Sequence, residues 1–504
     1  MSEKRPNILF IMSDDHAAHA LSCYGSKINQ TPNLDRIANE GALFQNCFCT
    51  NSICEPSRAG ILCRTYNHIN GVTTIGAHID NTLPNVAKEL QSDGYQTAIF
   101  GKWHLGEAKE NFPTGFDEWC ILQGQGPYFD PEMVHNGTKE QFTGYTTDII
   151  TDITLDYLKS RDQNKPFFIK YHHKAPHRNW IPDDKHKDMY KDVELPWPET
   201  LFDDYSNRSN AAKEAKMRIT TDINYSDIKV IPPEDIDNKY KSLHGGHVIP
   251  HPDDLTGFYL IPEETGEKVY FESHEELINF KYQRYIKDYL RCIASVDDNV
   301  GRVLDYLEAE DILDDTVVIY TSDQGFFLGD HGWFDKRFMY EESLRMPFIV
   351  RYPKEIKAGT VIDEIITNID IPATFVDWAG MKKPEYFQGH SFRPLLDGSV
   401  PDDWQQSMYY RYWMHLAHHY VSAHYGIRTK RYKLIYYYGE ALNQPGTIDE
   451  SKKPEWELFD LEEDPNELNN VYHNPEYSET ITELKDELHQ LQAKLKDSPV
   501  EEID

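Results

Sequence analysis

The sequence predicts an α/β fold built on a large, doubly wound, mixed but mostly parallel sheet flanked by helices. Two observations lead to this prediction. Short, nearly continuous apolar runs recur along the first 350 residues with helical segments between them, as is typical of strands buried on both faces of a sheet. Four of these runs are followed within a few residues by polar or charged side chains, and ligands of such sheets bind at the carboxyl ends of the strands.

The elements follow from local patterns. The predicted strands are, in chain order, Asn7 to Met12, Gln96 to Phe100, Pro166 to Tyr171, Thr316 to Tyr320 and Met346 to Val350. Helices are expected between them: one capped at Thr31 and closing at Gly41, one over 83–92, and an amphipathic one around 283–307. The alternation of strands and helices is what a doubly wound sheet requires.

Polar side chains follow the strands in a regular way. Asp14 and Asp15 come after the first strand, and Asp323 and Gln324 after the fourth. Lys102 and His104 follow the second strand, His177 follows the third, and Lys336 lies ahead of the fifth. A parallel sheet would gather these residues at one edge. Adjacent aspartates there suit a hard cation, although an ordinary turn explains the pair equally well when it stands alone.

We expect two structural units. Residues 1–399 are predicted to form the catalytic domain, and residues 400–504 a small subdomain with an antiparallel sheet and a terminal helix over 477–495. Residues 181–281 are polar and interrupted by proline, so they are predicted to be an insertion that covers the active edge and sets specificity. A surface elaboration without such a role is an equal alternative.

Composition narrows the class of protein. The 504-residue chain has a formal net charge of −33, which argues against nucleic acid and anionic membrane surfaces as partners. No apolar run approaches the length of a membrane span, so we expect a soluble chain without membrane insertion. The first residues lack an apolar leader. The expected location is periplasmic or secreted if a leader has been removed, and otherwise cytoplasmic.

The segment 51–65 stands out because a cysteine precedes a probable helix. Ser57 is predicted to cap that helix, with Arg58 in its first turn and Cys54 just ahead of its amino end. Unpaired N–H groups and the positive end of the helix dipole favour an anion at such a place. From the residues alone, Cys54 is a thiol of raised reactivity or simply a small buried cysteine.

Cys54-x-Pro56-Ser57-Arg58 resembles the signature of type I sulfatases, which belong to the alkaline phosphatase superfamily. Further segments match that family in the same order: Gly101-Lys102-Trp103-His104-Leu105-Gly106, Ala175-Pro176-His177, Ser322-Asp323-Gln324-Gly325 and Asp335-Lys336. Each match alone is modest evidence, but all of them in order are hard to obtain by chance. The resemblance covers nearly the whole chain and is weakest over 181–281.

The resemblance implies a complete catalytic apparatus. A formylglycine-generating enzyme or an anaerobic sulfatase-maturing enzyme would oxidise Cys54 to Cα-formylglycine, whose hydrate attacks the sulfur of the ester. One Ca²⁺ would be held by Asp14, Asp15, Asp323, Gln324 and the hydrated side chain at position 54. Lys102 and Lys336 would bind sulfate oxygens, and Arg58 would support the nucleophile. His177 is expected to protonate the leaving alcohol, and His104 to take the proton of the second hydroxyl.

One departure from the family pattern concerns maturation. The family signature usually continues Leu-Thr-Gly-Arg, whereas Leu62 is followed here by Cys63-Arg64-Thr65. Since Cys54, Pro56 and Arg58 are present, we expect maturation to be preserved, with weaker recognition by the maturing enzyme.

The loop after the fourth strand is similar to loops of bacterial sulfatases that act on sulfated carbohydrates. We therefore predict a sulfated oligo- or polysaccharide as substrate, such as the algal glycan ulvan or a glycosaminoglycan. His331, Arg337 and Glu341 are candidates for contacts to the sugar, and loop packing explains them equally well. Two other functions stay open: a phosphonate or phosphodiester hydrolase of the same superfamily, and a catalytically silent protein that binds sulfated glycans.

Overall fold

The computed structural model describes residues 5–242 and 245–502 and contains one ten-stranded sheet. From edge to edge, its strands are β15 (Thr360–Ile362), β2 (Ala42–Phe44), β14 (Phe348–Arg351), β11 (Thr316–Ser322), β1 (Asn7–Ser13), β8 (Phe167–His172), β4 (Gln96–Lys102), β5 (Glu118–Leu122), β6 (Glu132–His135) and β7 (Thr138–Gln141). The five strands from β11 to β5 are mutually parallel. This arrangement confirms the predicted mixed, mostly parallel sheet.

The strand β14 runs antiparallel to its neighbours β11 and β2. Its amino end therefore lies at the edge of the sheet where β11 has its carboxyl end. As a result, the long connection 323–347 leaves and re-enters the sheet at the same edge. Lys336 belongs to this connection, directly after the short strand β13 (Phe334–Asp335), which pairs with β12 (Phe327–Leu328).

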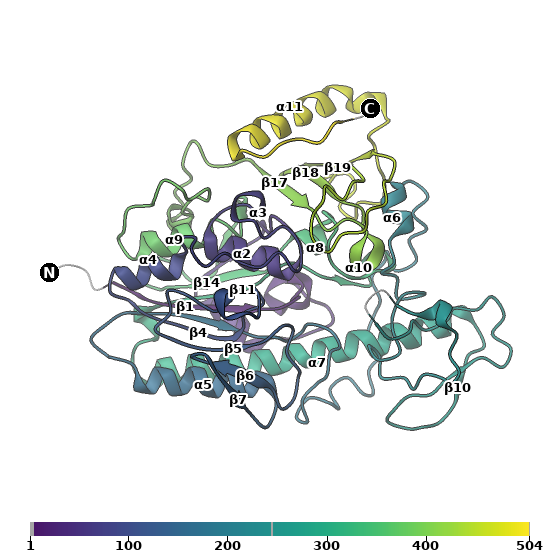
Figure 1. Ribbon diagram of the computed structural model, residues 1–504, viewed down its shortest axis with the longest axis horizontal. Helices are drawn as coiled ribbons and strands as arrows, with labels where there is room; N and C mark the ends of the chain where they lie inside the picture. Colours follow the sequence, from purple (N-terminus) through teal and green to yellow (C-terminus); the bar gives the residue numbers. More distant parts are fainter. Residues whose placement is uncertain (1–4, 243–244, 503–504) are drawn as a thin grey trace.

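Helices cover both faces of the sheet. Alternate residues of β1 point to opposite sides, and Phe10 joins a core with residues of α2 (Cys54–Cys63), α4 (Val86–Ser92) and α9 (Ile371–Trp378). On the other side, Ile11 packs in a core with α1 (Pro32–Asn39), α5 (Thr146–Ser160) and α7 (His274–Ala309). The two layers are visible above and below the strands in Figure 1.

A second, four-stranded antiparallel sheet lies near the carboxyl terminus, as predicted. It consists of β17 (Ser407–Tyr412), β18 (His424–Thr429), β19 (Tyr432–Tyr437) and β20 (Glu455–Asp460). The terminal helix α11 (Ser478–Leu495) buries Leu484 and Leu488 against this sheet (Figure 1).

The helix α7 is longer than predicted and spans 36 residues. It begins at His274 because the Ser273 hydroxyl accepts a hydrogen bond from the amide of Glu276, while the Glu276 carboxylate accepts one from the amide of Glu272. The last part of the expected insertion 181–281 is therefore helical. The remainder is mostly irregular and contains α6 (Asn210–Glu214), β9 (Tyr259–Leu260) and β10 (Val269–Tyr270).

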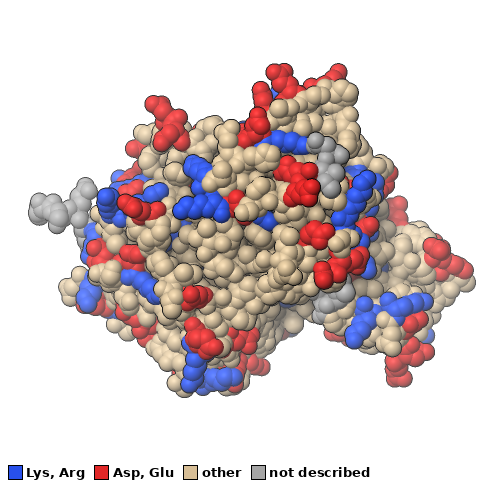
Figure 2. All heavy atoms as spheres, turned by 45° about the horizontal axis from the view of Figure 1, so that its top comes forward, with Lys and Arg blue, Asp and Glu red and all other residues tan. Residues whose placement is uncertain are grey.

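The surface carries both signs of charge. Figure 2 shows Asp and Glu in separate groups on the visible face, with Lys and Arg between them. Among the described helices, none combines the length and the apolar character that crossing a membrane requires.

Candidate active site at the carboxyl edge of the sheet

The register of the central strands brings four predicted site segments side by side. Ser13 of β1 is level with Ser322 of β11, and Met12 is level with His172 of β8. His172 is in turn level with Gly101 of β4. The residues that follow these strands consequently emerge at one edge, although they are far apart in the chain.

Three of the predicted metal ligands form a buried cluster there. Asp14, Asp15 and Asp323 are at most 1% exposed, and one carboxylate oxygen from each lies within 4.8 Å of the others. Gln324 donates a hydrogen bond to Asp15. The Oδ1 atom of Asp14 and the Oε1 atom of Gln324 are buried without a hydrogen-bond partner among the described residues.

This donor set fits a hard cation. Carboxylate and amide oxygens are the ligands that Ca²⁺ and Mg²⁺ prefer. Buried oxygen atoms without partners are costly unless something binds them. Burial also raises the pKa of Asp15 to about 6 even though Lys336 opposes the shift, and burial together with Asp14 raises the pKa of Asp323 well above its usual range. A divalent ion would relieve this repulsion.

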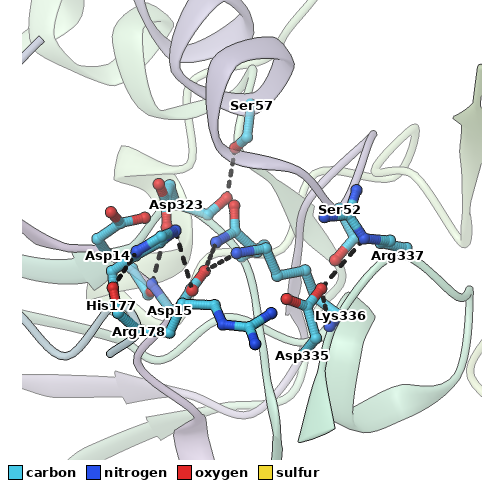
Figure 3. Close-up of polar contacts among 12 residues, drawn as sticks. Asp14, Asp15, Ser52, Ser57, His177, Arg178, Asp323, Asp335, Lys336 and Arg337 are labelled. Atoms are coloured by element: carbon cyan, nitrogen blue, oxygen red, sulfur yellow. Dashed lines mark hydrogen bonds and ion pairs between the residues drawn. The ribbon is translucent and has the colours of Figure 1, made fainter. Parts of the chain in front are cut away.

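Basic side chains surround the carboxylates. Lys102 binds Asp14, and the Nζ atom of Lys336 lies 2.5 Å from Oδ1 of Asp15. Figure 3 shows Lys336 reaching Asp15 from the side opposite Asp14. Burial by itself would raise the pKa of Asp14, but Lys102 and the neighbouring cations hold it well below its usual range. The edge therefore combines a cation site with ammonium groups suited to an anionic substrate.

Cys54 lies beside this cluster, and its position corrects one prediction. The helix α2 begins at Cys54 itself, with Ile53 as the preceding cap, so Ser57 does not cap it. Pro56 is tolerated in the first turn because its missing N–H is not needed there. The Ser57 hydroxyl instead donates to the backbone carbonyl of Asp323, as Figure 3 shows. Cys54 is 1% exposed and lines a cavity at the edge of the sheet.

Arg58 ties the site segments together. Its Nε atom donates to Oδ2 of Asp323 at 2.9 Å, and its Nη1 atom donates to the carbonyl of Lys102 at 2.9 Å. Its Nη2 atom lies 3.8 Å from Oδ1 of Asp14. Arg58 therefore fixes the geometry of the acidic cluster relative to Lys102.

The two predicted catalytic histidines have different surroundings. Nδ1 of His177 donates to the carbonyl of Arg178 at 2.8 Å, which leaves Nε2 directed at Asp15, 3.8 Å away. Burial holds the pKa of His177 well below its usual range and lowers that of His104 to about 3. Both rings are therefore neutral before an anionic substrate enters.

Gln125 was missed by sequence reasoning. Its side-chain oxygen accepts a hydrogen bond from Lys102, and its amide nitrogen lies 3.3 Å from Nε2 of His104. It follows β5, a strand that the sequence pattern did not predict. The only sequence feature that could have identified Gln125 is its position between Gly124 and Gly126, because glycines are common in the turns that follow strands.

The cavity above the cluster has a volume of about 1070 Å³. Three parts of the chain form its walls. The sheet edge contributes Cys54, His177 and Lys336, the expected insertion contributes Asn224 and Lys229, and the carboxyl-terminal segment contributes His418. The place of His418 in the cavity wall could not be predicted from the sequence, because the surrounding backbone follows no regular pattern. Leu416, His418, His419 and Tyr420 all have positive φ.

Of the three candidate sugar contacts, only Arg337 lines this cavity. His331 is 1% exposed and bonds to Asp203 at 3.2 Å, and Glu341 bonds to Arg428 and Lys433. Acidic and basic side chains from other segments thus enclose His331 and Glu341, as the alternative of loop packing describes.

Comparisons with known proteins identify the family to which the sequence is similar. The sulfatase family profile matches residues 6–381, and the profile described as N-sulphoglucosamine sulphohydrolase, C-terminal, matches residues 329–494. An N-acetylglucosamine-6-O-sulfatase of Bacteroides thetaiotaomicron is 44% identical over 509 residues, which cover 99% of this chain and 88% of the relative. An ulvan-active sulfatase of Formosa agariphila is 23% identical over 98% of this chain and 82% of its own length.

A solved structure extends the comparison to three dimensions. It is described as a complex with the substrate D-glucosamine-2-N,6-O-disulfate, and it superimposes with a TM-score of 0.85 at 43% identity, covering 98% of both chains.

Proposed function

The chain belongs to the sulfatase family, and on that premise we propose that it removes the 6-O-sulfate from glucosamine units of a sulfated glycan. The observation that supports this substrate is the 44% identity, over nearly the whole chain, to a protein named for N-acetylglucosamine 6-O-sulfate hydrolysis. The ulvan-active relative is much more distant at 23% identity. A glycosaminoglycan-type sugar is therefore favoured over the algal glycan.

We further propose that Asp14, Asp15, Asp323 and Gln324 hold one Ca²⁺, together with the modified side chain at position 54. Their unpartnered oxygens and close spacing support this assignment. When bound, the ion supplies positive charge that stabilises the charge developing on the sulfate oxygens. Formylglycine, made from Cys54 by a maturing enzyme, would supply the hydroxyl that attacks sulfur.

The chain's own side chains bind and orient the sulfate. Lys102 and Lys336 carry ammonium groups at opposite sides of the acidic cluster, where they would bind sulfate oxygens that the ion leaves free. Arg58 holds Asp323 and the backbone of Lys102 in place, so it positions both a proposed ion ligand and a proposed sulfate ligand.

Proton transfers fall to the two histidines. The ring of His177 is fixed by the bond from Nδ1 to Arg178 and lines the cavity, so a proton at Nε2, which lies 3.8 Å from Asp15, would pass to the leaving sugar oxygen. An entering sulfate adds negative charge, which favours the protonated ring. His104, held beside Lys102 by Gln125, would accept the proton released at position 54.

The test is sulfate release by matured enzyme, measured by ion chromatography on N-acetylglucosamine 6-sulfate, glucosamine 3-sulfate and ulvan oligosaccharides. Peptide mass spectrometry first verifies maturation through a loss of about 18 Da at Cys54, as expected for conversion of the thiol to an aldehyde. We expect release from the 6-sulfate alone. Release from ulvan alone would replace the proposed substrate. Faster cleavage of a phosphonate or phosphodiester, or binding without turnover in verified formylglycine enzyme, would replace the proposed reaction.

A further inference from the structure

Among the described residues that line the cavity, Lys174 is a lysine without a carboxylate partner. Lys174 lies in the turn after β8, three positions before His177, whose amide donates to the Lys174 carbonyl at 3.1 Å. The residue is 4% exposed, and its ammonium group lies 4.7 Å from the centre of the Tyr128 ring. Tyr128 in turn donates to the carbonyl of His177, so the lysine is held against the same wall as the proposed proton donor.

The other cations that line the cavity are neutralised by carboxylates. Lys336 binds Asp15, and Nε of Arg337 lies 3.1 Å from Asp335. Arg178 is bonded to Asp227 through two nitrogens, and Nζ of Lys229 lies 2.8 Å from Asp288. Lys174 has no hydrogen bond and no ion pair with any residue in the described ranges. Its charge is stabilised only by the face of Tyr128 and by the more distant aspartates of the acidic cluster.

A buried ammonium group has three donors and is costly to leave without acceptors. Burial lowers the pKa of Lys174 to about 8, which still leaves the group largely charged at neutral pH. A charged donor that is buried, unpartnered and directed at a substrate cavity is typical of a position where the ligand brings the acceptor.

We propose that Lys174 binds a second anionic substituent of the substrate, the N-sulfate of a 6-O-sulfated glucosamine, and so selects N-sulfated over N-acetylated sugars. The inference rests on the proposed glucosamine 6-O-sulfatase activity and adds a specificity-determining residue to it. The sulfate being hydrolysed already has Lys102, Lys336 and the cation site. Lys174 is therefore available to a different group of the same sugar.

Lys170 provides a matched control. It lies on β8 itself, is 2% exposed, and likewise has no ion pair with a described residue, its ammonium group lying 5.6 Å from the centre of the Phe10 ring. It does not line the cavity. Loss of a buried lysine charge as such is therefore tested by K170M, and loss of the cavity charge by K174M.

The experiment measures kcat and KM of matured wild type, K174M, K174R and K170M on D-glucosamine-2-N,6-O-disulfate and on N-acetyl-D-glucosamine 6-sulfate. Loss of a charge-assisted hydrogen bond predicts a fall of about ten- to a hundredfold in kcat/KM on the disulfate for K174M, mainly through KM. The change on the N-acetyl sugar should stay within about threefold, a difference too small to reflect a lost hydrogen bond. K174R should recover part of the loss, and K170M should match wild type on both sugars.

Equal losses of K174M on both sugars would overturn the proposal, because they would assign Lys174 to the reacting sulfate or to folding. An unchanged disulfate rate would overturn it as well. Failure of the proposed function has a different signature, since wild type would then release sulfate from neither sugar. In that event, binding of both sugars to the C54A variant is measured by calorimetry. Adding K174M to C54A must weaken the binding of the disulfate alone. Absence of disulfate binding to C54A contradicts the proposal.

Discussion

Nε of Arg58 lies 2.9 Å from Oδ2 of Asp323, although 265 residues separate the two in the chain. Both side chains are at most 2% exposed. The bond joins the helix that begins at Cys54 to the strand end that supplies two of the five proposed calcium ligands. It therefore connects the proposed nucleophile and the metal site mechanically.

Replacing Arg58 by Met should destabilise the protein by about 3–5 kcal/mol, because the buried carboxylate of Asp323 loses its partner. Calcium affinity should fall about ten- to a hundredfold, as is usual when a residue that orients a metal ligand is removed. Urea unfolding and calcium titration of the unmatured protein measure both effects. R36M is the control, since Arg36 pairs with Asp305 at the surface and such pairs contribute about 0–1 kcal/mol. Wild-type stability in R58M would contradict the structural role.

Calcium should raise the melting temperature of the unmatured protein. An ion that binds only the folded state stabilises it by about 2.7 kcal/mol at a hundred times its Kd. D323A should abolish this shift, while D402N, an exposed aspartate, should keep it. Differential scanning calorimetry with and without chelator provides the measurement. A melting temperature that does not respond to calcium would remove the acidic cluster from consideration as a metal site.

The general-acid role predicts a dependence on the leaving group. H177A should lose about 10²- to 10⁴-fold in kcat on a sugar 6-sulfate, whose alcohol needs a proton to leave. The loss should be much smaller on 4-nitrophenyl sulfate, whose phenolate leaves unaided. H104A should be impaired on both substrates. Steady-state kinetics of the two variants on the two substrates decide the assignment, and the reverse pattern would exchange the roles of the histidines.

His331 should make stability depend on pH between about 6.5 and 9. Burial alone would lower the pKa of this imidazole, but its hydrogen bond to Asp203 and the Glu342 carboxylate 3.7 Å away raise the pKa to about 9. Because the pKa of His331 is higher in the folded state than in the unfolded state, its protonation stabilises the folded protein fully below pH 6.5. This contribution to the free energy of unfolding disappears as the pH rises through 9. The shift corresponds to about 3 kcal/mol at most. Urea unfolding at pH 6 and pH 9.5 should show this loss in wild type and not in H331N, whose asparagine tolerates the φ of 54°. Parallel losses in both proteins would refute the assignment.

Much of the site could be predicted from the sequence because its residues follow buried parallel strands. Asp14, His177 and Asp323 lie within a few residues after recognisable apolar runs, and parallel strands bring such residues to one edge. The resemblance added catalytic roles for Cys54, Arg58 and the two lysines, which the residue pattern had only placed near the same edge. Local pattern failed at the start of α2, where the polar Ser57 looked like a cap but bonds to the carbonyl of Asp323 from a distant segment.

The sequence by itself determined five strands of the large sheet, β1, β4, β8, β11 and β14, and the polar residues that follow them, since both depend on local periodicity. Only the tertiary structure decided how the charges pair. It placed His331 beside Asp203, balanced Arg178 with Asp227, and left Lys174 facing the cavity without a carboxylate. The physical reason is that an ion pair forms only between atoms within about 4 Å of each other. The folding that brings two distant residues so close cannot be predicted from the sequence next to either of them.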